Sequence, residues 1–294
     1  MEIINNNTKE IKDASLILGF FDGIHLGHKN VIEKAVSVAK ETNSKTVLLT
    51  FKNSPAEFFN KEFSYICPRE ISYKKIETLG VDYIYETEFE TLAEISAEDY
   101  LESIVSIYHP QFITTGYNYT FGKNKKGTTK TLEENQEKYD YKYFCTPEYK
   151  FEKDSVSSTE IKKLLKIGNI EKANEFLGSP FSLTSKVIEG AKLGRKLGFP
   201  TANMIYPKNI IKIPYGVYLV ETLGRKGMLN WGIKPTVNGS SEILETNIFD
   251  FSDDIYGKDL EIKILKKIRD EKKFSSLEEL KNQIEKDKEY CLKS

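Results

Sequence analysis

The chain has 294 residues, a hydrophobic fraction of 39% and a formal net charge of −1 at pH 7. This length favours two domains, and the near-neutral charge excludes a global field that would draw the chain to nucleic acid or a membrane surface. Cys67, Cys145 and Cys291 lie far apart with no CxxC pair, so we expect neither a disulfide framework nor a zinc site. We find no signal peptide and no apolar run of about 18 residues, and we expect a soluble, cytoplasmic protein.

Lysine supplies most of the 43 basic residues. The arginines are Arg69, Arg195, Arg225 and Arg269. A lysine at a position where arginine is expected therefore reflects a compositional bias as much as a change of chemistry.

Short apolar runs alternate with helical patterns over the first 115 residues. We predict strands at 15–21, 45–51, 81–86 and 111–116 and helices at 28–41, 68–80 and 96–109. This order predicts a Rossmann-like α/β domain with a parallel sheet and right-handed crossovers. Ligands of such sheets bind beyond the carboxyl ends of the strands.

The character of the chain changes after Gly178-Ser179-Pro180. Residues 157–178 predict two short helices, and the pieces that follow are short, β-rich and separated by glycine or turn residues. Several short strands without intervening helices indicate a small antiparallel barrel. Residues 275–290 predict an amphipathic C-terminal helix. We place the domains at 1–181 and 182–294.

The stretch 19–28, GFFDGIHLGH, holds two of the three histidines of the chain. It follows the first predicted strand and opens the first helix, where free N–H groups and the positive end of the helix dipole favour phosphate. His25 and His28, three residues apart on that turn, can reach the same anion. Transfer of an adenylyl group needs such positioned donors and little covalent work by the protein.

Simpler interpretations exist for this stretch. A histidine at a helix start is usually a cap or a surface residue, and FFDG could be a mere turn. Two histidines could bind a metal, but the remaining one is His109, and a carboxylate or cysteine would have to complete the site. The whole pattern after a strand is much rarer by chance than its parts, and we favour a nucleotide site.

The HxGH pattern at this place resembles the signature of the nucleotidylyltransferases. With FDG ahead of it, the chain resembles the bacterial bifunctional riboflavin kinase/FMN adenylyltransferases. The resemblance implies that His25 and His28 contact ATP phosphates and steady the transition state. It implies an ATP site that also includes Gly19, Phe20, Asp22, Gly23 and Gly27.

Two further stretches of the first domain fit the family. Residues 116–122, GYNYTFG, match a family motif in which Asn118 is the expected flavin-site residue. An ordinary aromatic hairpin is the alternative interpretation of this stretch. Residues 157–162, SSTEIK, match a phosphate-binding motif, which implies that Ser158, Thr159 and Lys162 bind ATP; a helix cap is the plain alternative.

The first domain also departs from the family. Lys162 stands where the family has arginine, so charge survives but bidentate binding is lost. Residues 50–55, TFKNSP, replace a family proline and histidine by Asn53 and Ser54. We therefore keep open the alternative that the adenylyltransferase half is weak or lost.

A second glycine-rich stretch, 190–203, reads GAKLGRKLGFPTAN. It does not fit the P-loop spacing, but its backbone N–H groups can wrap phosphates, and Thr201 and Asn203 offer hard oxygens for the Mg²⁺ that accompanies ATP. A polar, glycine-rich hairpin is the alternative. The expected ATP-binding residues are Gly190, Lys192, Gly194, Arg195, Thr201 and Asn203.

This stretch closely resembles the riboflavin kinase domain of the same family, as do 214–220, 230–239, 245–262 and 268–274. The resemblance implies that Glu245 is the base for the ribityl 5′-hydroxyl and that Arg269 holds the flavin side of the site. By sequence alone, Glu245 would be one of many surface acids.

The resulting prediction is a flavin-cofactor enzyme that phosphorylates riboflavin to FMN and adenylylates FMN to FAD, using Mg²⁺ and ATP. A kinase with a weak adenylyltransferase is the nearest alternative, and a flavin-binding regulatory protein is a more distant one. We expect small-molecule substrates, no nucleic-acid or membrane partner, and a monomer or weak self-association.

Overall fold

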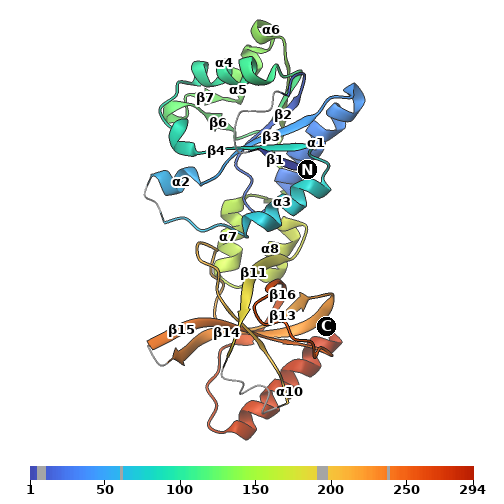
Figure 1. Ribbon diagram of the computed structural model, residues 1–294, viewed down its shortest axis with the longest axis vertical. Coiled ribbons are helices and arrows are strands. Elements are labelled where there is room, and N and C mark those ends of the chain that lie inside the picture. Colours follow the sequence, from blue (N-terminus) through green and yellow to red (C-terminus); the bar gives the residue numbers. More distant parts are fainter. Residues whose placement is uncertain (5–10, 60–61, 191–197, 237–238) are drawn as a thin grey trace. The chain divides into compact units, whose positions relative to one another are not determined.

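The computed structural model describes residues 1–4, 11–59, 62–190, 198–236 and 239–294, and it leaves the side chains of 234–241 undescribed. The chain forms two compact units. The first consists of Met1–Ser64 and Arg69–Ser158, and the second of Tyr65–Pro68 and Thr159–Ser294. Each unit has buried hydrophobic clusters of its own. Figure 1 shows the elements of both units.

The first unit is built on a six-stranded parallel sheet in the order β1-β4-β3-β2-β5-β8. Its strands, in that order, are Glu2–Ile4, Tyr83–Thr87, Thr46–Phe51, Ser15–Leu18, Phe112–Gly116 and Lys142–Thr146. All five pairings are parallel. The parallel α/β sheet predicted for this part of the chain is confirmed.

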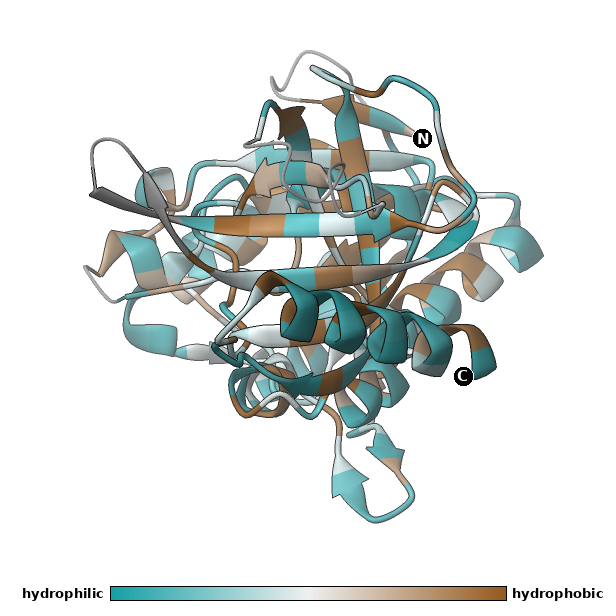
Figure 2. Cartoon of the chain, turned by 90° about the horizontal axis from the view of Figure 1, so that it is seen from below, coloured by the Kyte–Doolittle hydropathy of each residue, from teal (hydrophilic) through white to brown (hydrophobic). Residues whose placement is uncertain are grey.

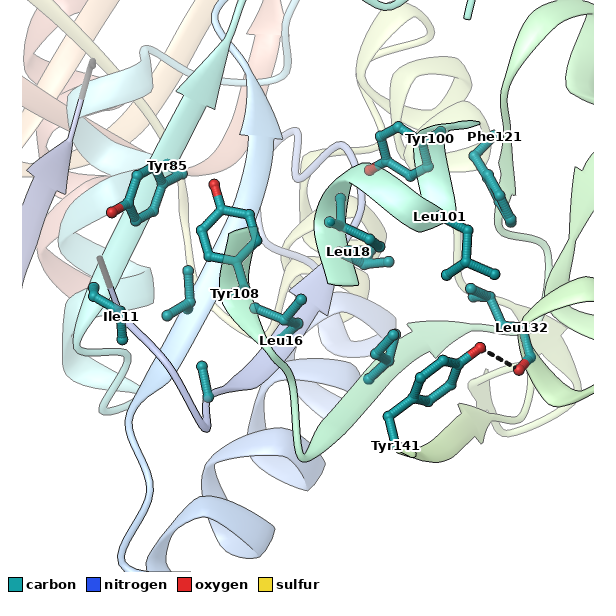
Figure 3. Close-up of a cluster of buried hydrophobic side chains, with 14 of the residues drawn as sticks. Ile11, Leu16, Leu18, Tyr85, Tyr100, Leu101, Tyr108, Phe121, Leu132 and Tyr141 are labelled. Atoms are coloured by element: carbon teal, nitrogen blue, oxygen red, sulfur yellow. Dashed lines mark hydrogen bonds between the residues drawn. The ribbon is translucent and has the colours of Figure 1, made fainter. Parts of the chain in front are cut away.

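Helices cover both faces of this sheet (Figure 1). On one face α1 (Leu26–Thr42) and α3 (Arg69–Thr78) pack on a cluster that includes Ile17. On the other face α4 (Ala97–Tyr108) packs on Leu16 and Leu18 (Figure 3). Neighbouring residues of a buried strand point to opposite faces, which explains why Leu16, Ile17 and Leu18 of β2 are all apolar.

Short elements connect and extend this framework. They are α2 (Pro55–Phe58), η1 (Phe89–Thr91), β6 (Thr120–Phe121), η2 (Lys123–Lys125), β7 (Gly127–Thr128), α5 (Thr129–Glu134), α6 (Gln136–Tyr139), β9 (Lys150–Phe151) and β10 (Asp154–Ser155).

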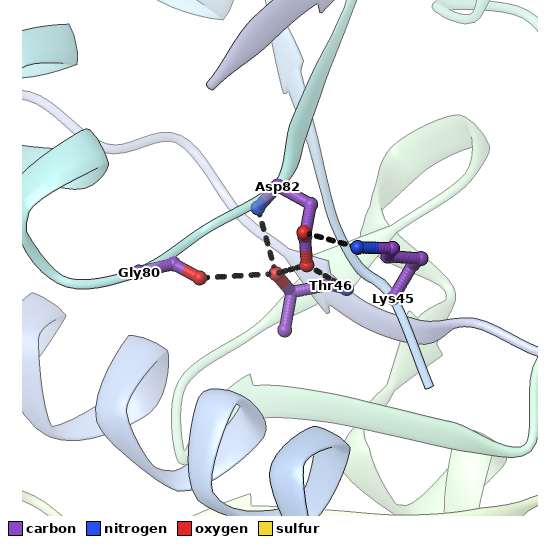
Figure 4. A network of polar contacts seen from close by, with 4 residues as sticks. All are labelled: Lys45, Thr46, Gly80 and Asp82. Atoms are coloured by element: carbon purple, nitrogen blue, oxygen red, sulfur yellow. Dashed lines mark hydrogen bonds and ion pairs between the residues drawn. The ribbon is translucent and has the colours of Figure 1, made fainter. Parts of the chain in front are cut away.

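A polar network fixes the entry of β3 against the entry of β4 (Figure 4). Asp82 accepts hydrogen bonds from the Thr46 backbone at 3.0 Å, from the Thr46 hydroxyl at 2.9 Å and from Lys45 Nζ at 3.0 Å. Burial by itself would raise the pKa of Asp82, but these hydrogen bonds outweigh it and hold that pKa below its ordinary value.

The second unit is a closed antiparallel barrel in the order β11-β12-β15-β14-β13-β16. Its strands in chain order are Phe181–Ile188, Ala202–Ile205, Gly216–Thr222, Arg225–Thr236, Gly239–Ile248 and Asp259–Asp270. Brown and teal positions alternate along these strands in Figure 2, as expected where one face fills the barrel. The predicted barrel is confirmed.

In the described part of the second unit the barrel is accompanied by α7 (Ser158–Lys166), α8 (Ile170–Leu177) and the largely hydrophilic α10 (Leu277–Lys293; Figure 2). Asn174 of α8 donates to the Ile264 carbonyl at 2.9 Å and accepts from the Phe181 N–H at 2.7 Å. The compact units therefore divide near residue 158, whereas the composition of the sequence suggests 181. The boundary at 181 stays a prediction about the domains.

Candidate active sites

The histidine turn connects β2 to α1 in the first unit. Gly23 has a φ of 80° and Ile24 a φ of 47°, so two successive residues lie in the left-handed region. That conformation is strained for a β-branched residue and costs on the order of 1–3 kcal/mol. Complete burial of the Ile24 side chain holds it in place. The turn is therefore a fixed shape ahead of the helix.

The two histidines form one stacked unit at the start of α1. His25 is the N-cap residue, and its Nδ1 accepts the His28 N–H at 3.2 Å. The ring centroids lie 3.7 Å apart with 20° between the planes, and Phe21 meets the His28 ring edge-on at 5.1 Å. A Cβ on Gly27 would lie 3.0 Å from the His25 ring, so any larger residue there would have to displace that ring. Because Nδ1 of neutral His25 accepts, its proton lies on Nε2, which can donate to a ligand.

Burial sets the charge of this pair. It lowers the pKa of His25 to about 4. Burial, and then the charge of His25, also lower the pKa of His28. Both rings are therefore neutral at pH 7, and His28 Nδ1 is buried without a hydrogen-bond partner. A triphosphate that entered this turn would supply an acceptor for such nitrogens.

The remaining residues predicted for this site lie at several places. Gly19 packs on the Phe21 ring, and Phe20 meets Phe63 at 6.1 Å. The buried Asp22 accepts a hydrogen bond from Ser158 Oγ at its carbonyl, at 3.3 Å. This bond brings the start of the SST motif to the histidine turn within the first unit.

The other three predicted residues lie on later elements. Asn118 is exposed in the turn after β5, and its Oδ1 faces Gly116. Thr159 and Lys162 lie on α7 in the second unit.

A cavity of about 220 Å³ opens beside the same edge of the sheet, and of its wall the sequence analysis assigned only Gly19 to a site. It is lined by Gly19, Leu49, Thr50, Phe51, Thr87, Thr91, Leu92, Tyr100, Ser103, Ile104, Ile107, Tyr108 and Tyr119. Aromatic and aliphatic groups dominate this wall, which suits a flat, largely apolar ring. No motif marks the α4 residues among these positions, because they recur only with ordinary helical spacing.

Two of the residues that depart from the family, Asn53 and Ser54, follow the wall residue Phe51 closely in the chain. Asn53 donates to Glu90 Oε1 at 2.7 Å and accepts from the Phe89 N–H at 3.1 Å. Ser54 caps α2 and forms a reciprocal capping box with Glu57. In this chain Asn53 and Ser54 thus hold α2 and η1 together.

The second site is a belt of side chains that are in register across the outer face of the barrel. Asn203 pairs with Glu245, which also pairs with Asn230. Asn230 pairs with Val217, and Val217 pairs with Arg269. Directly paired residues of antiparallel strands point to the same face. The barrel therefore brings Glu245, Asn203 and Arg269 onto one surface.

A cavity of about 220 Å³ lies on this surface and reaches to α10. Its wall consists of Phe199, Thr201, Val217, Met228, Asn230, Glu245, Asn247, Arg269, Glu271, Lys272, Phe274, Leu280, Ile284 and Asp287. Glu245, Thr201 and Arg269 were predicted from the sequence. The aliphatic wall from α10 was not, since only the fold brings that helix here.

Two of the predicted residues are held by neighbours. Arg269 donates from Nε to Asp287 Oδ2 at 2.9 Å and pairs with the same carboxylate at 2.8 Å, which ties β16 to α10. Asn203 lies against Gly190, where a Cβ would be 2.4 Å from its amide nitrogen, and donates to the Thr201 carbonyl at 3.3 Å.

The predicted residues Lys192, Gly194 and Arg195 lie outside the described residues. Within the described ranges no cluster of three histidine, cysteine or acidic side chains could hold a metal. Thr201 and Asn203 offer two neutral oxygens beside the cavity. Such a sparse donor set fits Mg²⁺ that arrives with nucleotide phosphates and keeps several waters.

An α/β unit with a histidine turn, and a barrel with its own acidic cavity, define a two-site transferase of the nucleotidyltransferase and kinase class. Residues 7–160 match the model of the FAD synthetase family, and residues 177–294 match that of riboflavin kinase. The chain belongs to the family of bifunctional riboflavin kinase/FMN adenylyltransferases.

Curated relatives that carry this two-part name match the chain over nearly their whole length. The chain is 36% identical to the bifunctional riboflavin kinase/FMN adenylyltransferase of Bacillus subtilis, over 97% of this chain and 93% of the relative. It is 33% identical to that of Haemophilus influenzae, over 97% and 96%.

A solved structure from Streptococcus pneumoniae, titled a macrolide-efflux protein, superimposes with a TM-score of 0.86 at 30% identity. It covers 98% of this chain, and the chain covers 97% of it. Among the described helices of the present chain, none is both long and apolar enough to cross a membrane.

Proposed function

We propose that the two reactions of the family occur in separate units: adenylylation of FMN at the histidine turn, and phosphorylation of riboflavin at the barrel cavity. The observation that supports this division is that each unit has its own cavity beside its own phosphate-type motif.

At the barrel, Glu245 acts as general base. Its carboxylate takes the proton of the ribityl 5′-hydroxyl while that oxygen attacks the γ-phosphorus of ATP and ADP leaves. Asn230 and Asn203, which flank Glu245 in register, orient the reacting groups. Thr201 and Asn203 would hold the Mg²⁺ of the nucleotide, which supplies charge neutralisation on the phosphates when bound. Gly190, Lys192, Gly194 and Arg195 complete the proposed ATP site.

At the histidine turn, no protein base is needed. The phosphate of FMN is already ionised, and its oxygen attacks the α-phosphorus of ATP while pyrophosphate leaves. Neutral His25 and His28 donate hydrogen bonds to the charge that builds up on the phosphate oxygens. The aromatic cavity beside Gly19 receives the flavin ring.

A kinase with a weak adenylyltransferase is the second candidate. It is favoured by Asn53 and Ser54, which replace the family's proline and histidine, and by Lys162 at an arginine position. We further propose that the chain works in the cytoplasm as a monomer or weak self-associate, without nucleic-acid or membrane partners.

The test is a product analysis after incubation with riboflavin, ATP and Mg²⁺. We expect wild type to form FMN and FAD, His28→Ala to lose FAD formation about 10²–10³-fold, and Glu245→Gln to lose FMN formation about 10²–10⁴-fold. The matched controls are His109→Asn, on an exposed helix end, and Glu221→Gln, in an exposed ion pair. Loss of both products from a single folded variant would refute the division, and absence of FAD from wild type would favour the second candidate.

A further inference from the structure

The barrel cavity contains a second carboxylate that the proposed roles leave unexplained. Glu271 directly follows β16 and lines the cavity. The charged neighbours in the wall are engaged: Arg269 pairs with Asp287 at 2.8 Å, and Lys272 pairs with Glu279 at 3.2 Å. Among the residues that the structure describes, Glu271 makes no hydrogen bond or ion pair. Its oxygens are available to a ligand.

Gly232 of β14 has no side chain, and the Glu271 carboxylate lies in the space that this leaves. A Cβ on Gly232 would be 2.5 Å from Glu271 Oε1 and 3.2 Å from its Cδ. Gly232 follows Asn230 by two residues, and Asn230 follows Met228 by two, so the three positions face the same side of the strand. Met228 and Asn230 line the cavity. The Glu271 carboxylate therefore occupies the space that a side chain at position 232 would fill, in line with Met228 and Asn230.

The row also fixes the relation of Glu271 to Glu245. Asn230 lies directly opposite Glu245 in the strand register. One step of the row, from Asn230 to Gly232, is roughly 7 Å along the strand. This distance is comparable with the length of an extended ribityl chain. A flavin whose terminal hydroxyl faces Glu245 can thus place its other ribityl hydroxyls at Glu271.

The chemistry of the group selects hydroxyl donors. An ionised carboxylate only accepts hydrogen bonds, and its two oxygens can serve two neighbouring hydroxyls at once. Such charge-assisted hydrogen bonds are among the stronger ones that a neutral polyol can form. A flavin without a polyol chain has no hydroxyl to donate at this place.

We propose that Glu271 binds the ribityl chain of riboflavin by accepting hydrogen bonds from its hydroxyls, and that it makes the kinase site prefer flavins with a polyol over bare flavins. This rests on the proposed function in one respect, namely that phosphoryl transfer occurs at Glu245. Glu271 binds and selects the substrate, whereas Glu245 takes the proton.

The experiment compares riboflavin with lumiflavin, which has the same ring system and a methyl group instead of the ribityl chain. In the full-length enzyme, the KM of riboflavin and the inhibition constant of lumiflavin are both measured in the kinase reaction. Glu271→Ala raises the KM of riboflavin about tenfold, as expected for the loss of a hydrogen bond to a charged group, and changes the lumiflavin constant less than about twofold. Glu271→Gln, which keeps one acceptor oxygen, gives an intermediate KM.

The control is Glu285→Ala, which removes the same charge from an exposed ion pair on α10 and leaves both constants unchanged. A parallel rise of both constants in Glu271→Ala and Glu271→Gln, or no rise in either, overturns the proposal. Failure of the proposed function is seen separately: Glu245→Gln would then leave kcat unchanged, while the comparison of riboflavin with lumiflavin still reports on Glu271.

Discussion

Arginine persists in this lysine-rich chain at two places where it pairs with a buried carboxylate. Arg269 grips the Asp287 carboxylate with two nitrogens, at 2.9 and 2.8 Å. Arg69 contacts the buried carboxylate of Glu86 at 3.0 Å. A lysine ammonium can replace the charge in such pairs but not the bidentate geometry. We therefore expect an arginine-to-lysine exchange to leave stability unchanged only where the arginine does not use two of its nitrogens at once.

We accordingly expect Arg269→Lys to lower the free energy of unfolding of the barrel by about 1–3 kcal/mol, because the buried Asp287 loses one of its hydrogen bonds. Urea unfolding followed by Trp231 emission measures this, since Trp231 is fully buried in the barrel. The matched control is Arg225→Lys, at an exposed hairpin position, which should change stability by less than about 0.5 kcal/mol. Equal effects of the two exchanges would contradict the role given to the fork.

The sequence predicted the helices and strands that have a strong hydrophobic period, and it missed the two edge strands of the parallel sheet. The seven elements expected between residues 15 and 116 all occur. β1 was missed because only one of its three residues is buried, and β8 because most of its residues are partly exposed. β12 was taken for part of a glycine-rich loop, because its strand character comes from pairing with β15.

In the two sites, the residues that lie in sequence motifs could be predicted, and the apolar residues of the walls could not. The histidine turn was predicted because its composition is unusual, and Glu245 was predicted because its stretch resembles the riboflavin kinase family. Tyr108 in one cavity and Ile284 in the other were not found, because each is an ordinary apolar position of its helix. Only tertiary packing turns such a position into the wall of a site.

The polar network at the entry of β3 and β4 gives a prediction for these elements. Thr46 is 1% exposed, and its hydroxyl accepts the Asp82 N–H at 2.8 Å. Thr46→Val leaves that N–H and the Asp82 carboxylate each short of one partner, which should cost about 1–3 kcal/mol. Urea unfolding followed by far-UV circular dichroism would show it. Thr78→Val, which removes an exposed hydroxyl from α3, is the control, and a loss as small as that of the control would refute the importance of the network.

For the whole molecule, the distribution of histidine makes the two units respond differently to acid. His25, His28 and His109 all lie in the first unit, and the single tryptophan, Trp231, lies in the second. The folded pKa of His25 is about 4, whereas an unfolded histidine titrates near 6.5. Below pH 6.5 the unfolded state therefore binds more protons, and stability falls as the pH falls toward 4.

We expect this linkage to cost the first unit about 2 kcal/mol at pH 5 through His25 alone, at about 1.4 kcal/mol per pH unit. Burial lowers the pKa of His28 as well and adds to the loss. In urea unfolding, the circular dichroism transition of the first unit should move to lower urea between pH 7.5 and pH 5, while the Trp231 emission midpoint stays in place. His28→Asn should reduce the pH shift, and His109→Asn, on an exposed helix end, should preserve it. A Trp231 midpoint that moved with the first transition would mean that the two units unfold as one, and the assignment of acid sensitivity to the histidine turn would fail.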